Sequence, residues 1–450
     1  MASTDTTRAG ERLPPGPPFP MPIQTMLVWG QMERFLGACR RRYGNIFTIR
    51  AAPVGTLVYI SDARDIATVF KGDPNIYRAG EGNVVFEPVM GARSLLRIDG
   101  AEHLEIRRAM LPPFHGENVR RFEGLILEVA REQTAQWPIG EPFALHPHMH
   151  AITLEIIIRA VIGVDGPNEL AKFRPRLRAV AALGGPLMLM WLWPGLGRFG
   201  QWRRYRETHA QAERLLYDEI CQRRRCADLD ERHDVLSALI RTTDLDDETL
   251  RDQLMTLLLA GHETTATALS WTFERVLRHP SALQRLEETL EAGEEEYVDA
   301  VIKEALRVRP VVFAVARKLT EPVELGGYVL PEGITVMPTI GLVQNLEENY
   351  PDAETFRPER FLDGQAERYT WIPFGGGTRR CIGAPFSLFE MRTVIRSVLS
   401  EFEPRAPSLR PESMSMRHVT HTPGRGAEVI VTRRSRPWES PAKLGATAAN

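Results

Sequence analysis

The sequence predicts a mainly helical protein with small β-sheets, and three observations lead to this fold class. Most of the 450 residues lie in segments whose apolar side chains recur every three or four positions, as in an amphipathic helix. Only a few short runs are rich in the β-branched and aromatic residues of strands. No internal repeat, low-complexity tract or linker divides the chain. We therefore expect a flexible proline-rich head at residues 1–20, a single domain at 21–437 and a loose tail at 438–450.

The composition is that of an ordinary globular protein and excludes several classes. Lys and Arg total 56 and Asp and Glu total 58, so the formal net charge of −2 excludes a strongly basic nucleic-acid-binding protein. Hydrophobic residues make up 43% and charged residues 25% of the chain, unlike disordered or fibrous proteins. The four cysteines lack paired metal-ligand spacing, and no secretion signal is evident, so we expect a reducing, cytoplasmic location.

The most apolar stretch, residues 179–197, indicates a loop rather than a membrane-spanning helix. It is uncharged and contains the Leu-, Met- and Trp-rich run at 187–193. Pro186, Pro194 and four glycines interrupt it, and such residues break a helix. We therefore expect no transmembrane anchor.

Strands are expected at two places. Residues 45–50 and 56–61 are β-rich runs separated by a short segment with Pro and Gly, which predicts a β-hairpin. A second hairpin is expected within residues 323–336, with Pro331-Glu332-Gly333 as its turn.

Helical spacing is clearest at residues 120–137, 152–162 and 202–225. The longest helical pattern runs from about Asp247 to Arg278 and is long enough to cross the whole molecule. Asp246 or Asp247 can cap its start, and the sequence His279-Pro280 stops it.

The middle of this long helix breaks a local rule. Residues 260–265 read Ala-Gly-His-Glu-Thr-Thr, and glycine and β-branched hydroxyl residues are poor choices for a helix interior. Such breaks inside a strong element tend to mark functional sites. We therefore expect the middle of the helix to belong to a site.

The sharpest chemical signal is the decapeptide Phe374 to Gly383, which contains Cys381 and is followed by a helix. At a helix start the free backbone N–H groups and the helix dipole favour the thiolate form of cysteine. That form suits a soft metal ligand or a nucleophile. The glycines let the backbone pass close to a flat partner, and Arg379 offers a cation to an acidic one. The alternative is a buried structural cysteine beside a glycine-rich turn.

Three further motifs carry charge. Glu304 and Arg307 are three residues apart on one helix face, an arrangement that is common on protein surfaces. Arg360, in an irregular stretch at 356–361, can complete a charge triad with them. His103 and Arg107 place two potential donors on one helical face.

Several rival sites fail on the sequence. A zinc-protease motif that starts at His262-Glu263 requires a second histidine at position 266, which is Ala266. No Gly-Lys-Ser/Thr phosphate loop and no Gly-x-Ser-x-Gly elbow is present. Cys221 and Cys226 flank a basic stretch and indicate an exposed helix face rather than a metal site.

In this order and spacing, the four motifs resemble those of the cytochrome P-450 family, the haem-thiolate monooxygenases. The cysteine decapeptide is the most specific of them and is intact at Phe374, Gly377, Arg379, Cys381 and Gly383. The resemblance covers the chain from the proline-rich head to the last strand region. It implies a triangular, mostly helical fold with haem b (iron protoporphyrin IX) held between the long helix and the cysteine loop.

The resemblance implies a role for each motif. Cys381 matches the axial iron ligand, whose anionic sulfur favours O–O bond cleavage. Glu263 and Thr264 match the acid–alcohol pair that delivers protons to bound dioxygen, and Gly261 lets the helix widen over the iron. The residues expected to contact haem are His103, Arg107, Ala260, Gly261, Arg317, Phe374, Gly375, Arg379, Cys381 and Gly383. Four of these match positions that hold the propionates: His103, Arg107, Arg317 and Arg379. Glu304, Arg307 and Arg360 match the buried structural triad behind the cysteine loop.

Alignment with the family's pocket segments predicts a mostly apolar substrate site. The expected lining is Phe86, Val89, Met90, Leu258, Ala260, Val311, Val312, Phe313, His421 and Thr422. With residues 187–193 as an access lid, this lining indicates a lipophilic substrate such as a fatty acid, sterol or terpenoid. The alternative is that these side chains belong to the core.

The resemblance also implies partners. Without an anchor or a fused reductase, the chain matches soluble bacterial members, which take electrons from a separate ferredoxin and its reductase. Arg108, Arg380, Arg392 and Arg396 are candidate docking cations, with a generic solvated surface as the alternative.

The expected reaction inserts one oxygen atom of dioxygen into an apolar small molecule. A peroxide-using or isomerase-type haem enzyme is a second reading, although it needs no proton delivery and so has less use for Glu263 and Thr264. A non-enzymatic haem sensor is a third.

Overall fold

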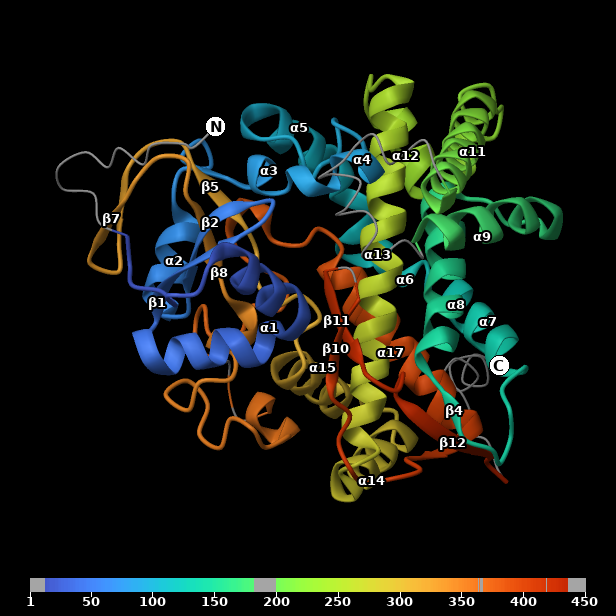
Figure 1. The fold of residues 1–450 in the computed structure, drawn as a ribbon. Helices are drawn as coiled ribbons and strands as arrows, with labels where there is room; N and C mark the ends of the chain where they lie inside the picture. The colour runs from blue at the N-terminus through green and yellow to red at the C-terminus, as the bar shows by residue number, and fades with distance from the viewer. Residues whose placement is uncertain (1–12, 182–199, 363, 365–366, 418, 436–450) are drawn as a thin grey trace.

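The computed structural model describes residues 13–181, 200–362, 364, 367–417 and 419–435 of the chain. The predicted class, mainly helical with small sheets, is confirmed. In Figure 1, α13 runs through the centre of the molecule, with a sheet and helices α1 and α2 to one side and most other helices to the other. Helix α13 carries the candidate site residues Gly261, Glu263 and Thr264.

The α-helices of the described residues have the following bounds: α1 (Met21–Tyr43), α2 (Ala63–Lys71), α3 (Ala79–Gly82), α4 (Glu87–Met90), α5 (Gly100–Met110), α6 (Glu117–Arg120), α7 (Glu123–Thr134), α8 (His146–Ile157), α9 (Pro167–Ala181), α11 (Gly200–Arg223), α12 (Val235–Thr242), α13 (Asp247–Val276), α14 (Pro280–Glu291), α15 (Glu296–Val308), α16 (Ile340–Val343) and α17 (Ala384–Glu401). The strands are β1 (Ile46–Ala51), β2 (Gly55–Ile60), β3 (Tyr77–Arg78), β4 (Phe143–Ala144), β5 (Arg317–Leu319), β6 (Val323–Leu325), β7 (Tyr328–Leu330), β8 (Thr335–Pro338), β9 (Phe402–Arg405), β10 (Met414–Arg417), β11 (Thr420–Pro423) and β12 (Glu428–Arg433).

The largest described sheet has five strands in the order β1-β2-β8-β5-β3. Its β2–β8 pair is parallel and its other pairs are antiparallel. The hairpin predicted near the N-terminus is confirmed as β1 and β2, with Ile46 opposite Ile60. Smaller sheets pair β4-β12-β9, β10-β11 and β6-β7.

The turn predicted for the second hairpin is wrong. Strands β6 and β7 pair with each other, and the residues between them are Gly326 and Gly327. Both glycines have positive φ, at 56° and 79°, which two-residue hairpin turns favour. The segment Pro331-Glu332-Gly333 instead leads to β8, which pairs with β2 and β5 in the large sheet.

The predicted helices are present with shifted ends. The pattern at 202–225 corresponds to α11, whereas the pattern at 120–137 is broken into α6 and α7. The helix predicted at 152–162 begins earlier, because α8 starts at His146, and it continues through a π-helical turn at 158–162. The Pro147 ring suits the first turn of α8, where no backbone N–H donor is needed.

Helix α13 extends over 30 residues, nearly as predicted. Asp246 caps it, because its side chain accepts a hydrogen bond of 2.8 Å from the Thr249 amide. The helix stays α-helical through residues 260–265, so the sequence that disfavours a helix is held by its surroundings. It contacts α8, α11, α15, α17 and β11, and most of its side chains are buried.

The described part of the proline-rich head is packed against the large sheet, where a flexible segment was expected. The Thr48 hydroxyl donates to the Pro14 carbonyl at 2.7 Å, and the Thr48 amide donates to the Pro15 carbonyl at 3.0 Å. A Cβ atom on Gly16 would lie 2.0 Å from the Thr48 carbonyl oxygen, so only glycine allows this approach. The expected loose tail at 438–450 and the expected lid at 187–193 lie outside the described residues.

Among the described residues, no helix combines the length and apolar character that a membrane crossing requires.

We predict that Thr48→Val lowers the free energy of unfolding by about 1 kcal/mol, because it leaves the buried Pro14 carbonyl without its hydroxyl donor. Residues 13–15 should also become more sensitive to limited proteolysis. Thr56→Val is the matched control on the neighbouring strand. Equal effects of the two substitutions would contradict anchoring through Thr48.

Candidate functional site

Cys381 lies in a tight loop between a 3₁₀ turn at Gly377–Arg379 and helix α17. The Cys381 amide donates to the Phe374 carbonyl at 2.9 Å, which closes the glycine-rich segment. Gly375 and Gly377 both have a φ of 66°, and a Cβ atom on Gly377 would lie 2.0 Å from the Phe70 carbonyl oxygen of α2. The glycines therefore let the loop fold back on itself and pack against α2.

Opposing effects act on the Cys381 thiol. Burial raises its pKa, while the backbone N–H groups of Gly383 and Ala384 and the cations of Arg107 and Arg380 lower it. The balance leaves the pKa above the ordinary value for cysteine. Direct coordination to a metal cation deprotonates such a thiol, and the surrounding donors then stabilise the anion.

The middle of α13 carries a small accessible face. Ala260, Gly261 and Thr264 keep accessible surface, although Leu258 and Thr265 beside them are buried. The Thr264 hydroxyl donates to the Ala260 carbonyl at 2.7 Å.

This part of α13 contacts the helix that follows Cys381. The Thr265 hydroxyl lies 3.2 Å from the Ser387 hydroxyl in the first turn of α17. A Cβ atom on Gly261 would lie 2.9 Å from the Ile157 Cδ1 atom of α8, so the glycine permits close packing of α13 against α8.

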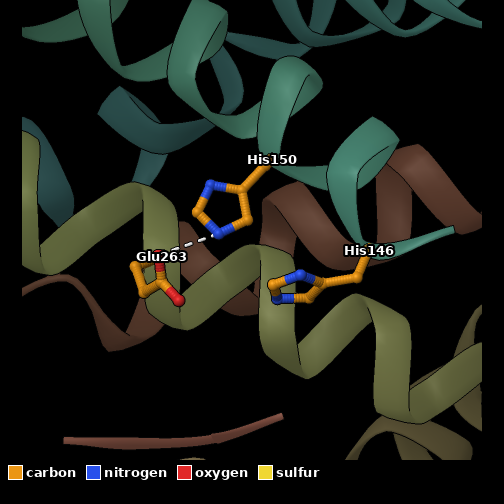
Figure 2. Close-up of side chains that lie close together, drawn as sticks. All are labelled: His146, His150 and Glu263. Carbon is orange, nitrogen blue, oxygen red and sulfur yellow. Dashed lines mark ion pairs between the residues drawn. The ribbon is translucent and has the colours of Figure 1, made fainter. Parts of the chain in front are cut away.

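The carboxylate of Glu263 points toward α8 and the β10–β11 hairpin. Its Oε2 atom lies 2.8 Å from the His150 Nε2 atom, as Figure 2 shows. Its Oε1 atom accepts a hydrogen bond of 3.5 Å from the Thr420 hydroxyl and lies 3.8 Å from the Arg417 Nε atom. Glu263 is thus a buried acid with contacts on two neighbouring elements.

Four basic residues from separate elements influence one another electrostatically. Burial, together with the charges of Arg379, Arg107 and Arg317, lowers the pKa of His103 to about 3. Burial and Arg379 lower the pKa of Arg317 to about 10. Burial also lowers the pKa values of Arg107 and Arg379. Arg379 lowers the pKa values of His103 and Arg317, and Arg107 lowers those of His103 and Arg379, so the four side chains form one basic cluster.

Asp99 is an acidic partner of this cluster. It forms an ion pair with Arg379, and its two oxygens also accept from the amides of Gly80 and Glu81 at 2.9 and 3.1 Å. One carboxylate so shared does not neutralise the cations of Arg107, Arg317 and Arg379. An anionic ligand with two carboxylates would supply the missing charge.

The predicted triad of Glu304, Arg307 and Arg360 is brought together. Arg307 donates to Glu304 through two hydrogen bonds of 2.7 and 2.8 Å, and both side chains have 0% exposure. The Arg360 Nε atom donates to Glu304 at 3.3 Å. Arg307 also donates to the carbonyls of Gln344 and Ala353, so its charge and its donors are both satisfied.

The predicted pocket residues do not all share one environment. Leu258 and Val311 pack in the large helical core, Val312 packs against the sheet core, and Phe313 packs with α1, β1 and β2. Phe86 and Val312 keep accessible surface, whereas Val89, Met90 and Thr422 are buried. The His421 amide donates to the Val311 carbonyl at 2.8 Å, which joins β11 to this segment.

The four candidate docking cations differ in their surroundings. Arg392 forms ion pairs with Glu295 and Asp299, and Arg396 with Glu123 and Glu295. The side chains of Arg108 and Arg380 are exposed.

Sequence reasoning missed the histidines of α8. His146 and His150 lie next to Glu263, and these three residues each offer a possible ligand atom within 4.8 Å of the others. Their i, i+4 spacing was available as a signal, but the predicted helix began at residue 152, beyond both histidines. The error in the helix start hid the pair.

A glycine-rich cysteine loop that leads into a helix packed against a long central helix, with a basic cluster beside the loop, is the arrangement of a haem-thiolate protein. The sequence model of the cytochrome P-450 family matches residues 14–429, and the chain belongs to this family. Members of the family are monooxygenase oxidoreductases with haem iron, and they use dioxygen and redox partners.

Relatives and solved structures agree with this assignment. The chain is 44% identical to cytochrome P-450 135B1 of Mycobacterium tuberculosis over 93% of this chain and 91% of the relative. It is 39% identical to cytochrome P-450 135A1 of the same organism, over 95% and 96%. The structure of retinoic-acid-bound cyanobacterial CYP120A1 has a TM-score of 0.82 at 21% identity, covering 94% of this chain and all of that one. A cytochrome P-450 haem domain has the same TM-score and identity, with 94% and 98% covered.

The residues present fit haem on three counts. Cys381 is an exposed residue whose thiol pKa lies above the ordinary value, so the thiol needs a metal cation to persist as a thiolate. The basic cluster carries excess positive charge that two propionates would neutralise. Ala260, Gly261 and Thr264 keep an accessible face on an otherwise buried helix.

We predict that Arg307→Met destabilises the protein by about 3 to 5 kcal/mol, because it leaves the buried Glu304 carboxylate without its main partner. Urea unfolding of the haem-loaded protein measures this effect. Arg285→Met, which removes an exposed pair with Glu359, should cost only about 0 to 1 kcal/mol. If the two variants unfold at the same urea concentration, the triad does not stabilise the fold.

Proposed function

We propose that this protein inserts one oxygen atom of dioxygen into a lipophilic small molecule of the fatty acid, sterol or terpenoid class. Electrons would come from a separate ferredoxin and its reductase. Haem b, when bound, would supply the chemistry of dioxygen activation. The observation that carries the proposal is the Cys381 loop, which leads directly into α17, together with the contact between α17 and α13 beside the accessible Thr264.

In this proposal Cys381 holds the iron, and the basic cluster of His103, Arg107, Arg317 and Arg379 holds the propionates. The Arg107 side chain donates to the Arg380 carbonyl at 2.6 Å, so it also braces the loop next to Cys381. The faces of the porphyrin would contact Ala260, Gly261, Phe374, Gly375 and Gly383. The alanine and the three glycines among them suit a flat partner, because they allow its close approach.

Glu263 and Thr264 are assigned to proton delivery. Thr264 provides a hydroxyl on the accessible face of α13, and its bond to the Ala260 carbonyl leaves the oxygen free to accept. Glu263 holds a proton-transfer group on the buried side, in contact with Thr420 and Arg417. Arg417 is 42% exposed, which supports a route between solvent and the acid.

The apolar side chains of Phe86, Val89, Met90, Val311 and Val312 support a lipophilic substrate. Leu258, Phe313 and Thr422 complete the proposed surroundings. Burial lowers the pKa of His421 to about 4, so its imidazole adds no charge there at neutral pH.

A single domain at residues 21–437 and a cytoplasmic location belong to the same proposal. The exposed Arg108 and Arg380 are its best candidates for docking an acidic electron carrier, since the other two cations are already paired.

We expect Cys381→Ser to abolish the strongly red-shifted Soret band in the reduced carbon-monoxide difference spectrum, because a hydroxyl cannot replace the thiolate. Cys226→Ser is the control and should keep the band. A red-shifted band that survives in Cys381→Ser would reject the ligand assignment and the proposed function with it.

We expect Thr264→Ala to uncouple electron consumption from product formation while the carbon-monoxide spectrum stays unchanged. The measurement compares reductant consumed with product formed, using a lipophilic compound selected by its spin-state shift. Thr272→Ala removes the same kind of hydroxyl bond, to Ala268 at 2.8 Å, in a buried part of the same helix, and should stay coupled. Full coupling in Thr264→Ala would favour chemistry that needs no proton delivery.

A further inference from the structure

We propose that His146, His150 and Glu263 form a binding site for a single divalent cation of the zinc type, between helices α8 and α13. This site is separate from Cys381 and its basic cluster. The two histidines come from α8 and the carboxylate from α13, and Figure 2 shows the three side chains gathered between these helices.

The composition of the cluster suits zinc. Two imidazoles and one carboxylate are a ligand set that Zn²⁺ uses with a fourth position left to water. One ligand atom from each residue lies within 4.8 Å of the others, and His150 Nε2 and Glu263 Oε2 are 2.8 Å apart. Tetrahedral bonds of about 2.0–2.1 Å place ligand atoms about 3.3 Å apart. Small side-chain rotations are therefore needed, with the close pair opening and the third ligand moving inward.

The backbone already holds the ligands in position. His146 and His150 are four residues apart and lie on the same face of α8. The Thr153 hydroxyl of α8 donates to the His262 carbonyl of α13 at 3.0 Å, directly beside Glu263 in the sequence. The two helices are in extensive contact. Because the ligands stand on packed helices rather than loops, little conformational entropy is lost when a cation binds.

The surroundings of His146 also suit a metal ligand. The side chain is buried, and the Thr267 hydroxyl lies 3.2 Å from its Nε2 atom. This hydroxyl can orient the ring, as outer contacts of metal-bound histidines do.

A third histidine gives independent support. His262 is 2% exposed, and its Nε2 atom has no hydrogen-bond partner among the described residues. Its ring centroid lies 5.2 Å from that of His150, which in turn lies 4.8 Å from that of His146. A buried polar nitrogen without a partner is costly. A cation, or water bound to it, next to His150 would provide an interaction for this nitrogen.

A simple ion pair between His150 and Glu263 is the alternative to a cation site. It accounts for the 2.8 Å contact, but it leaves the buried His262 Nε2 atom without a hydrogen-bond partner among the described residues. Arg417 approaches the other oxygen of Glu263 at 3.8 Å, and its charge opposes a second cation. Its 42% exposure lets the guanidinium turn into solvent, where its charge is screened.

One consequence rests on the proposed function. A cation bound to Glu263 would occupy the carboxylate that we assign to proton delivery. Zinc at this site would therefore lower the amount of product formed for each pair of electrons consumed, without displacing haem.

The site itself is tested by counting zinc. Haem-loaded wild-type protein is dialysed against ZnCl₂ at buffered free concentrations, and bound zinc is measured by elemental analysis. We expect His146→Ala and His150→Ala each to bind one ion per chain fewer than wild type. His148→Ala, on the same helix but in contact with Phe143 and Trp137, should bind as wild type does. Zinc counts that are equal in all four proteins would overturn the proposal.

Two further measurements control for damage to the haem site and for failure of a variant to fold. The carbon-monoxide spectrum of each variant reports whether the haem site is intact, and Glu263→Gln provides a nearly isosteric variant should an alanine substitution prevent folding. Glu263→Gln should also lose the ion, and retention of full zinc binding would exclude the carboxylate as a ligand. Zinc counting does not depend on turnover, so its result stands whether or not the proposed monooxygenase reaction is found.

If the protein is an active monooxygenase, zinc should reduce coupling in wild type but not in His146→Ala. Equal zinc effects on both would overturn the inhibitory consequence.

Discussion

The architecture depends on keeping one long helix almost entirely out of water. Most of the 30 residues of α13 are buried, so their polar side chains need hydrogen-bond partners inside the fold. Thr264, Ser270 and Thr272 solve this locally, because each hydroxyl donates to the carbonyl four residues earlier. Glu263 cannot do so and depends on groups from α8 and the β10–β11 hairpin. The helices and strands that contact α13 therefore also determine the surroundings of its functional residues.

The Glu304–Arg307 pair and the basic cluster around Arg379 differ in whether their charges are balanced within the fold. Arg307 and Glu304 are fully buried and satisfy each other, with backbone carbonyls taking the remaining guanidinium donors. The cluster of His103, Arg107, Arg317 and Arg379 is different, because burial and neighbouring cations lower the pKa values of its members, and Arg379 shares the carboxylate of Asp99 with backbone amides. Repulsion between buried cations destabilises a fold unless a bound anion balances their charge. Sequence spacing alone could not tell these two arrangements apart.

The sequence was informative where short-range chemistry decides the structure. The cap at Asp246, the extent of α13 and the first hairpin follow from local signals, and the structure agrees with them. Predictions failed where several local signals competed. Both Gly326-Gly327 and Pro331-Glu332-Gly333 favour a turn, and only the pairing of β8 with β2 decides between them. The division of residues 311–313 among three cores is also set by tertiary packing, so alignment with a family pocket could not predict which side chains keep accessible surface.

Two chemistries are proposed for Glu263, and the sequence does not separate them. Its position before Thr264 suggested an acid near the reaction centre, yet its side chain points away from the accessible face, against His150. Adjacent residues on a helix point about 100° apart, so an acid beside Thr264 must reach its partner through other groups, such as water or a rotated side chain. Proton delivery requires the carboxylate to move or exchange protons, whereas a cation held with His146 and His150 requires it to stay. The two roles therefore exclude each other at any one moment, and the occupancy of the histidine site would decide which of them Glu263 performs.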